Sequence, residues 1–322
     1  MSRTSKKFIL LFVLTLLAVI LYMTVNVRFD KPKLFAYAME LRSVKITVML
    51  LVAFAIGAAS LVFQSIINNT IVTPCLLGMN SLYSLIHTAV AFFLGTGSIL
   101  VQNEKLAFAV DLGIMGSAAT FIYSYMFKKT KYNVLYVLLI GTVLTSFFSS
   151  IQSSLVRAMD PNEYETLLTA LVASFNNINE EILLFSALLM AAVVFALRKD
   201  LAVLDVITLG KDQAINLGID YDKVIRHLLL GVVLFISIAT ALVGPVSFLG
   251  LIIANLARQI FKTYRHSQLI LAASLIGMLL LIAGQLIVEQ FYAYAIPISV
   301  FISTGGGLYF LYLLFAQRRR TK

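Results

Sequence analysis

The sequence has very little charge and almost no cysteine, and both shortages narrow the kind of protein it can be. Only 12% of its 322 residues are charged, while 60% are apolar and the mean hydropathy is +0.95. Soluble globular domains carry about 25% charged residues, so this composition excludes an ordinary soluble domain. A single cysteine, Cys75, excludes an intrachain disulfide, and we expect it to be a small buried apolar residue.

Catalytic motifs are missing as well. The chain has no G-x-x-x-x-G-K-[ST] segment to cradle ATP phosphates, and it has neither HExxH nor GxSxG. Its three histidines, His87, His227 and His266, lack the spacing of metal ligands. These absences disfavour a membrane-embedded enzyme and a chain that hydrolyses ATP by itself. We therefore expect this chain to bind no metal or cofactor.

Long apolar segments dominate the chain instead. Several reach the ~20 residues that cross a bilayer core of ~30 Å as a helix. We predict an all-α polytopic membrane protein with about ten transmembrane helices, at residues 8–25, 46–66, 76–95, 106–127, 133–156, 182–197, 225–243, 246–261, 267–288 and 296–316. The first span follows Arg3, Lys6 and Lys7 and lacks a cleavage site, so we expect it to be retained.

The basic residues predict the orientation of these spans. Counted by alternate loops, 18 of the 25 Lys and Arg residues fall on the side of the two termini and 7 on the other. Cytoplasmic loops are the richer in Lys and Arg, so we expect both termini in the cytoplasm. We attribute the net charge of +10 to this bias rather than to nucleic acid. Asp111 falls near the outer edge of its span, where we expect it to reach water.

The 58 residues from Ile46 to Asn103 carry no Asp, Glu, Lys or Arg. As one helix they would extend about 87 Å at ~1.5 Å per residue, so the chain must reverse inside the run. Turn-forming residues occur only in FQSIINNTIVTPCLLG, residues 63–78. Irregular backbone in a membrane must be covered by protein or a wet cavity, which favours a buried turn over an uncharged headgroup loop. We expect Gln64 and Asn69 to satisfy its backbone groups, and Pro74 to begin the next helix.

A polar stripe runs along the fifth predicted span. Its residues recur at three- and four-residue spacing, at Thr142, Thr145, Ser146, Ser149, Gln152 and Ser153. Two interpretations stay open, hydroxyl packing against another helix or the wall of a wet passage. On the second interpretation the translocation pathway includes Thr142, Ser146, Ser149 and Ser153, together with Gln64 and Asn69.

The longest cytoplasmic loop, at about residues 198–226, contains a short amphipathic segment. Leu209, Ala214 and Leu217, bounded by Gly210 and Gly218, predict a helix with an apolar face. Such a helix outside the membrane, on the side where ATP is found, is a natural docking element. A helix that lies on the membrane surface is the alternative.

These residues occur in an order that resembles the FecCD-type permeases, the membrane subunits of ABC importers for ferric siderophores, haem and cobalamin. The resemblance runs from about Leu41 to the end of the chain. It rests on five groups of positions, which are Arg42 with Lys45, Gln64 to Gly78, Leu209 to Gly218, Gly244 to Arg258, and Ile296 to Phe310. The chain departs from the family pattern at Ala254, Asn255, Gly284, Val288 and Leu308.

The resemblance implies one transmembrane permease domain over residues 1–322, in a bacterial cell membrane, that imports a ferric siderophore. Its NNTIVTPCLLGMNSLY segment is similar to the catechol-type subgroup. The implied partners are a second permease, usually a different related chain, two ATPase subunits that bind ATP and magnesium, and an extracellular siderophore-binding protein. The chain itself is then not an enzyme.

The resemblance also assigns roles to residues. It places ATPase coupling at Leu209, Gly210, Ala214, Leu217 and Gly218, and binding-protein docking at Arg42 and Lys45, which we expect just before the second span. An ion-coupled secondary transporter of a small polar solute is the alternative function. It is disfavoured because charges within the spans are scarce and because such a carrier has no use for an ATPase dock.

Overall fold

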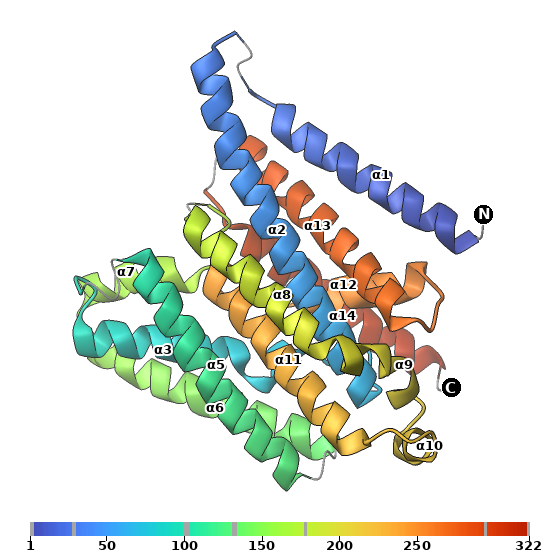
Figure 1. The fold of residues 1–322 in the computed structure, drawn as a ribbon. Coiled ribbons are helices and arrows are strands. Elements are labelled where there is room, and N and C mark those ends of the chain that lie inside the picture. Colours follow the sequence, from blue (N-terminus) through green and yellow to red (C-terminus); the bar gives the residue numbers. More distant parts are fainter. Residues whose placement is uncertain are drawn as a thin grey trace.

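The computed structural model describes residues 3–27, 30–98, 103–130, 134–176, 179–292 and 295–320, and every regular element in these ranges is helical (Figure 1). Asn133, the first residue of the fifth predicted span, lies outside them. The elements in chain order are α1 (Arg3–Thr24), α2 (Pro32–Ile67), η1 (Pro74–Leu77), α3 (Met79–Leu94), α5 (Glu104–Lys129), α6 (Val134–Ala158), α7 (Pro161–Leu171), α8 (Glu180–Ala202), α9 (Leu204–Ile207), α10 (Lys211–Asn216), α11 (Tyr221–Val243), α12 (Leu249–Ile260), α13 (His266–Phe291) and α14 (Ile298–Arg320).

Each of the ten predicted spans overlaps one apolar helix. In the part of the chain that the structure describes, seven helices are long and apolar enough to cross a membrane, namely α1, α2, α5, α6, α8, α11 and α13. Three shorter apolar helices, α3, α12 and α14, overlap the other predicted spans. The prediction of an all-α, multi-pass membrane protein is confirmed. The count of ten stays a prediction, because the 12 residues of α12 reach only about 18 Å.

Two contacts between distant segments define the ends of the helix bundle. At one end, which we call the α9 end, Lys7 near the start of α1 donates a hydrogen bond to the carbonyl of Ile260, the last residue of α12. At the other, the Glu289 end, Tyr22 near the end of α1 donates to Glu289 near the end of α13, at 2.7 Å. In Figure 1 α9 and α10 lie at the lower right, opposite the start of α2 at the top.

Small residues let α2 and α13 pack closely in the centre of the bundle. A Cβ atom at Gly277 would lie 3.0 Å from the Cβ of Ala53, and one at Gly57 would lie 3.3 Å from the Cβ of Ala273. Close approach through small residues is typical of helix pairs in membranes, where packing rather than water exclusion drives association. Both helices are therefore fixed relative to each other along their middle turns.

The helix α2 begins much earlier than predicted, at Pro32 rather than residue 46. Its 36 residues extend about 54 Å, beyond the thickness of a bilayer core. Arg42 and Lys45 therefore lie inside the helix α2, and their position just before its membrane-crossing part, residues 46–66, stays a prediction. Charge ends an apolar segment but not a helix, and Pro32 stands at the first turn, where proline favours helix initiation.

A short helix, α7, follows α6 where the sequence analysis placed only a loop. Asp160 is its N-cap, and its side chain accepts a hydrogen bond from the backbone N of Asn162 at 2.9 Å. Pro161 occupies the first helical position. This pairing of a capping aspartate with a proline is a recognised start signal for a helix, and it was present in the sequence.

The charge-free run reverses direction between α2 and α3, as predicted, but protein covers the turn only in part, because Asn68 and Asn69 are exposed. The carbonyl of Thr70 accepts two side-chain hydrogen bonds at 2.8 Å, from Nε2 of Gln64 and from Nδ2 of Asn255 on α12. Pro74 begins the next helix, as predicted, but this helix is the single 3₁₀ turn η1, and the longer helix α3 begins at Met79. An unsatisfied carbonyl would be costly in lipid, so these two amides make the reversal possible.

Gly78, between η1 and α3, has a backbone conformation and a neighbour that both exclude a side chain. Its φ is +87°, and a Cβ atom there would lie 2.9 Å from Oγ1 and 3.2 Å from the backbone N of Thr145 on α6. The turn can therefore touch α6 directly.

We predict that Gly78→Ala lowers the thermal stability of the purified chain more than Gly218→Ala. Both glycines have positive φ, and an alanine held in this left-handed conformation costs roughly 1–2 kcal/mol of stability at either position. Only Gly78 adds a clash, because nothing lies within 4 Å of a Cβ atom at Gly218. The measurement is thermal unfolding in detergent, and equal shifts in the two variants would contradict the close packing of the turn on α6.

Candidate functional site

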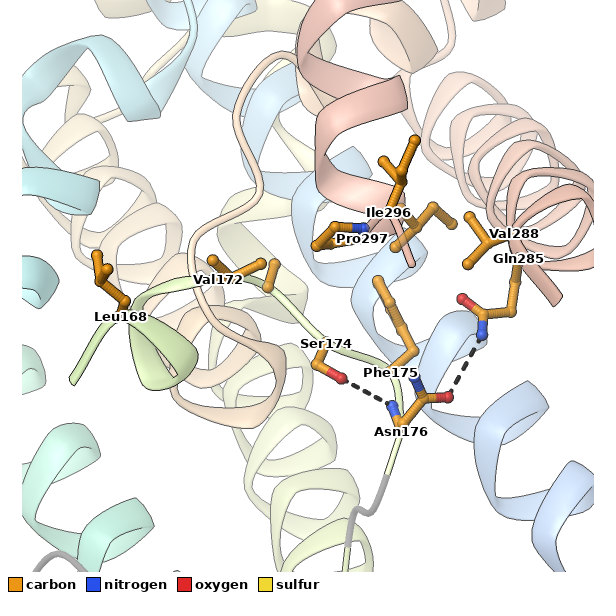
Figure 2. A pocket seen from close by; sticks show the side chains of 11 residues that line it. Leu168, Val172, Ser174, Phe175, Asn176, Gln285, Val288, Ile296 and Pro297 are labelled. Carbon is orange, nitrogen blue, oxygen red and sulfur yellow. Dashed lines mark hydrogen bonds between the residues drawn. The ribbon is translucent and has the colours of Figure 1, made fainter. Parts of the chain in front are cut away.

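A cavity of about 400 Å³ lies beside the last turns of α13 (Figure 2). Its volume falls in the range of small-molecule sites, ~300–1,000 Å³. Eleven residues line it, and none of them is charged. Eight are apolar and three are polar, and they are Leu168, Val172, Ala173, Phe175, Val288, Ile296, Pro297 and Ile298, with Ser174, Asn176 and Gln285.

The end of α11 holds one wall of this cavity in place. The backbone N of Ser174 donates to the carbonyl of Val243 at 2.8 Å. A Cβ atom at Gly244 would lie 3.0 Å from the Cα of Ala173, so the glycine lets the two backbones touch. Ala173 and Ser174, which follow α7, are thereby held in place although they are not helical.

The polar edge of the cavity leads to a buried carboxylate. Nε2 of Gln285 donates to Oε1 of Glu289 at 2.9 Å and lies 3.4 Å from Oδ1 of Asn176. Figure 2 shows the amides of Asn176 and Gln285 pointing toward each other across the cavity edge. The amide of Gln285 therefore connects the cavity wall to Glu289.

Glu289 joins α1, α2 and α13 at the Glu289 end. Its side chain is only 7% exposed, and it accepts hydrogen bonds from the hydroxyl of Tyr22, from Gln285 and from Nζ of Lys45, at 3.1 Å. A buried carboxylate is tolerated when a cation and further donors compensate it. One of the two predicted docking cations therefore has a partner in its own chain.

Arg42, the other predicted docking cation, also contacts its own chain. It donates to the carbonyl of Tyr22, and its guanidinium lies 5.4 Å from the centre of the Tyr22 ring. Arg42 and Lys45 are each only partly exposed. They lie together, as the three-residue spacing predicts, but inside the network around Glu289 rather than free on the surface. Their docking role stays a prediction.

Gln64 and Asn69 serve the turn between α2 and α3. Gln64 is buried, and its Oε1 has no hydrogen-bond partner among the described residues. Asn69 is exposed, and its Oδ1 accepts from the backbone N of Ile71 at 3.0 Å. Asn255, which shares the Thr70 carbonyl with Gln64, was noted in the sequence only as a departure from a family pattern.

The polar stripe on α6 divides into two parts. Ser149 faces α3, with its Oγ 3.2 Å from Oγ of Ser81. Thr142, Ser146 and Ser153 are exposed in the single chain. Hydroxyl packing therefore accounts for Ser149, whereas the three exposed residues remain available to a passage or to a second subunit.

The short helix predicted between Gly210 and Gly218 is present as α10, and a second short helix, α9, precedes it in the same loop. Gly210, with φ of +102°, separates α9 from α10, and Gly218 follows α10 with φ of +80°. Leu209 and Leu217 are 60% and 63% exposed, but Ala214 is 0% exposed. The expectation that Ala214 belongs to the exposed apolar face was wrong, because α10 turns this small residue inward. Ile215, 51% exposed, takes its place.

Sequence reasoning missed a buried histidine–aspartate pair. Nε2 of His87 on α3 lies 2.8 Å from Oδ2 of Asp111 on α5. Asp111 is buried, so the expectation that it reaches water was wrong. The pair lines a smaller cavity of about 170 Å³, together with Thr166 and Leu167 of α7. The pair was missed because α7 was taken for a loop although its start signal, Asp160 with Pro161, was present in the sequence.

Comparison with known proteins places this geometry in a family. The chain is 38% identical over 283 residues to the petrobactin import system permease protein YclO of Bacillus subtilis (strain 168). The aligned residues make up 88% of this chain and 90% of that protein. It is 31% identical over 292 residues to the petrobactin import system permease protein FatC of Bacillus anthracis, over 90% of this chain and 81% of that protein.

A solved structure described as an inward-facing conformation of an ABC transporter of the metal-chelate type has the same fold. The TM-score is 0.79 over 97% of this chain and 99% of that chain, at 21% identity. The family model of the FecCD transport family matches residues 7–316. The sequence motifs, the helical fold and this match over nearly the whole length lead to one conclusion, that the chain belongs to the FecCD transport family.

Proposed function

We propose that the chain is the transmembrane permease subunit of an ATP-driven importer that brings a ferric siderophore into a bacterial cell. Its similarity to two petrobactin permeases supports a catechol-type siderophore as the substrate. The partners are a second, related permease, two ATPase subunits and an extracellular siderophore-binding protein. ATP and magnesium bind to the ATPase subunits, and this chain has no catalytic role.

The observation that carries the proposal is the exposed apolar face of the coupling segment. Leu209, Ile215 and Leu217 are each more than half exposed at the α9 end of the bundle. A cluster of apolar side chains in water marks an interaction site. The charged neighbours Lys211 and Asp222, which pair at 3.0 Å, surround it with a polar rim. We assign this face to an ATPase subunit and the α9 end to the cytoplasm.

In this orientation the cavity of Figure 2 opens toward the outer face, where the binding protein delivers its load. Its apolar walls suit the ring faces of a catecholate, and its amides suit polar ring substituents. We infer that the cavity forms one side of the entrance, and that the second permease supplies the other. The exposed hydroxyls of Thr142, Ser146 and Ser153 continue the passage.

One observation favours an ion-coupled secondary transporter as a second candidate function. His87 and Asp111 form a buried pair, and pairs of this kind serve as proton relays in carriers. The two functions differ in their energy source. Asp111→Asn abolishes uptake in an ion-coupled carrier but leaves ATP-driven uptake in an importer.

Co-purification of the tagged chain from its own host tests the proposal. A second permease should be recovered in an amount equal to the tagged chain, together with two ATPase subunits for each copy of it. Recovery of this chain alone, with uptake retained in the purified state, would refute the importer and favour the carrier.

We predict that Leu217→Glu and Ile215→Glu detach the ATPase and stop uptake while the chain stays folded. Each removes an exposed leucine or isoleucine contact worth roughly 1.5–3 kcal/mol on burial, or about 10–100-fold in affinity. Ala214→Glu is the contrasting variant, since it buries a charge and should lower thermal stability itself. ATPase binding that survives in the first two variants would leave the segment as a surface helix.

Exchanging the charges of Lys45 and Glu289 separates the proposed docking role of Lys45 from its role in the ion pair with Glu289. Lys45→Glu sets two carboxylates together and should destabilise the chain by about 3–5 kcal/mol. The double variant Lys45→Glu with Glu289→Lys restores the pair and the stability. We predict that uptake and binding-protein affinity stay lost in the double variant, because docking needs the positive charge at position 45 itself, beside Arg42.

The control for this exchange is Lys105→Glu with Glu181→Lys, which reverses an exposed pair and should change nothing. If the double variant at Lys45 and Glu289 recovers both stability and uptake, Lys45 serves the internal pair alone.

Single cysteines on α6 test the passage, in a chain where Cys75 is replaced by serine. A small water-soluble thiol reagent should label cysteines at Thr142, Ser146 and Ser153 in the assembled importer. Cysteines at Val143 and Phe147 should stay unlabelled because lipid covers that face, and one at Ser149 should react slowly because it faces α3. Equal labelling at all positions would remove α6 from the passage wall.

A further inference from the structure

The carboxylate of Asp205 on α9 caps the start of α13. Its Oδ1 accepts a hydrogen bond from the backbone N of His266 at 2.9 Å, and it also lies within hydrogen-bond reach of Nδ1 of the same residue. The residue that precedes the helix, Arg265, makes no side-chain cap of its own. The first backbone N–H groups of a helix need acceptors and favour negative charge, so Asp205 satisfies α13 from a separate element.

The two helices of the coupling segment differ in how they are held. Leu204 and Ile207 of α9 are buried in the core of the bundle. Ile215 and Leu217, in and after α10, are exposed. The segment thus has an anchored half that carries Asp205 and a projecting half that carries the apolar face.

The helix α13 connects this anchor to the cavity. It runs unbroken from His266 to Phe291, 26 residues or about 39 Å, and contains no proline. Its last turns contribute Gln285 and Val288 to the cavity wall, and Glu289 to the pair with Lys45. A displacement of the start of a continuous helix also displaces its other end, because packed helices move as units.

We propose that Asp205 is a positioning residue that couples the ATPase dock to the cavity through α13. When the ATPase subunits move α10, the bond between Asp205 and His266 carries that movement to α13, and Gln285 and Val288 move with it. This inference rests on the proposed importer function. It goes further in naming one bond and one helix as the connection between the two ends.

A second histidine–aspartate pair at the same end provides a matched control. Asp200 at the end of α8 lies 3.2 Å from Nδ1 of His227 on α11. It has the same residue types, but within the described residues no side-chain hydrogen bond joins it to α13. Loss of this pair should leave the connection to the cavity intact.

The test uses the assembled importer in lipid vesicles, with Cys75→Ser and a cysteine introduced by Val288→Cys. Val288 is buried in the cavity wall, so its labelling by a water-soluble thiol reagent reports movement of the wall. With Asp205 and Asp200 intact, ATP should change the labelling rate by at least about fivefold, the lower range of coupling between sites. Asp205→Ala should abolish this response and lower the iron transported per ATP by a similar factor, with ATPase binding unchanged. Asp200→Ala should keep the response.

Each other outcome is decisive. A normal response in Asp205→Ala would reduce Asp205 to a helix cap, and lost ATPase binding in that variant would make it part of the dock; either result overturns the inference. An intact complex without any response to ATP would refute the proposed function as well. Should Asp205→Ala fail to fold, Asp205→Asn replaces it, because it keeps an acceptor oxygen without the charge. An intermediate response is then expected, and a full one would overturn the inference.

Discussion

The carbonyl oxygen of Thr70 accepts hydrogen bonds from Gln64 on α2 and from Asn255 on α12. The arrangement of these helices around the turn depends on the two bonds. A chain that carries no charge over 58 residues has no charged side chain that would hold its turn in water. It can reverse inside the protein only if the free carbonyl finds donors there. The two amides provide them, from α2 and from α12, and so fix both helices against the start of α3.

The same rule explains how much could be predicted from the sequence. Apolar length alone located the helices, because a bilayer requires about 20 apolar residues for each crossing. The reversal within the charge-free run could be predicted from its length and from the missing charge. The hydrogen bond that Asn255 donates to Thr70 could not be predicted, since the two residues are 185 positions apart and no local pattern pairs them. The partner of Lys45, Glu289, and the partner of Asp111, His87, were missed for the same reason.

Two local features, the early start of α2 and the inward orientation of Ala214, were missed for a different reason. The helix α2 continues through Arg42 and Lys45 because helix propensity, unlike hydropathy, is indifferent to charge. The inward turn of Ala214 depends on the positive φ of Gly210, which sets the direction of α10. Such local errors change which residues a partner can touch. In the structure the exposed apolar face consists of Leu209, Ile215 and Leu217. The predicted docking cations, Arg42 and Lys45, lie in a network that borders the cavity.

The central claim is that ATP hydrolysis by partner subunits drives import through this chain. Uptake of a radiolabelled ferric catecholate into vesicles that contain the purified complex tests it most directly. The account predicts accumulation only with the binding protein outside and ATP inside, and no effect of collapsing the proton and sodium gradients. Accumulation without ATP that disappears when those gradients are collapsed would contradict it.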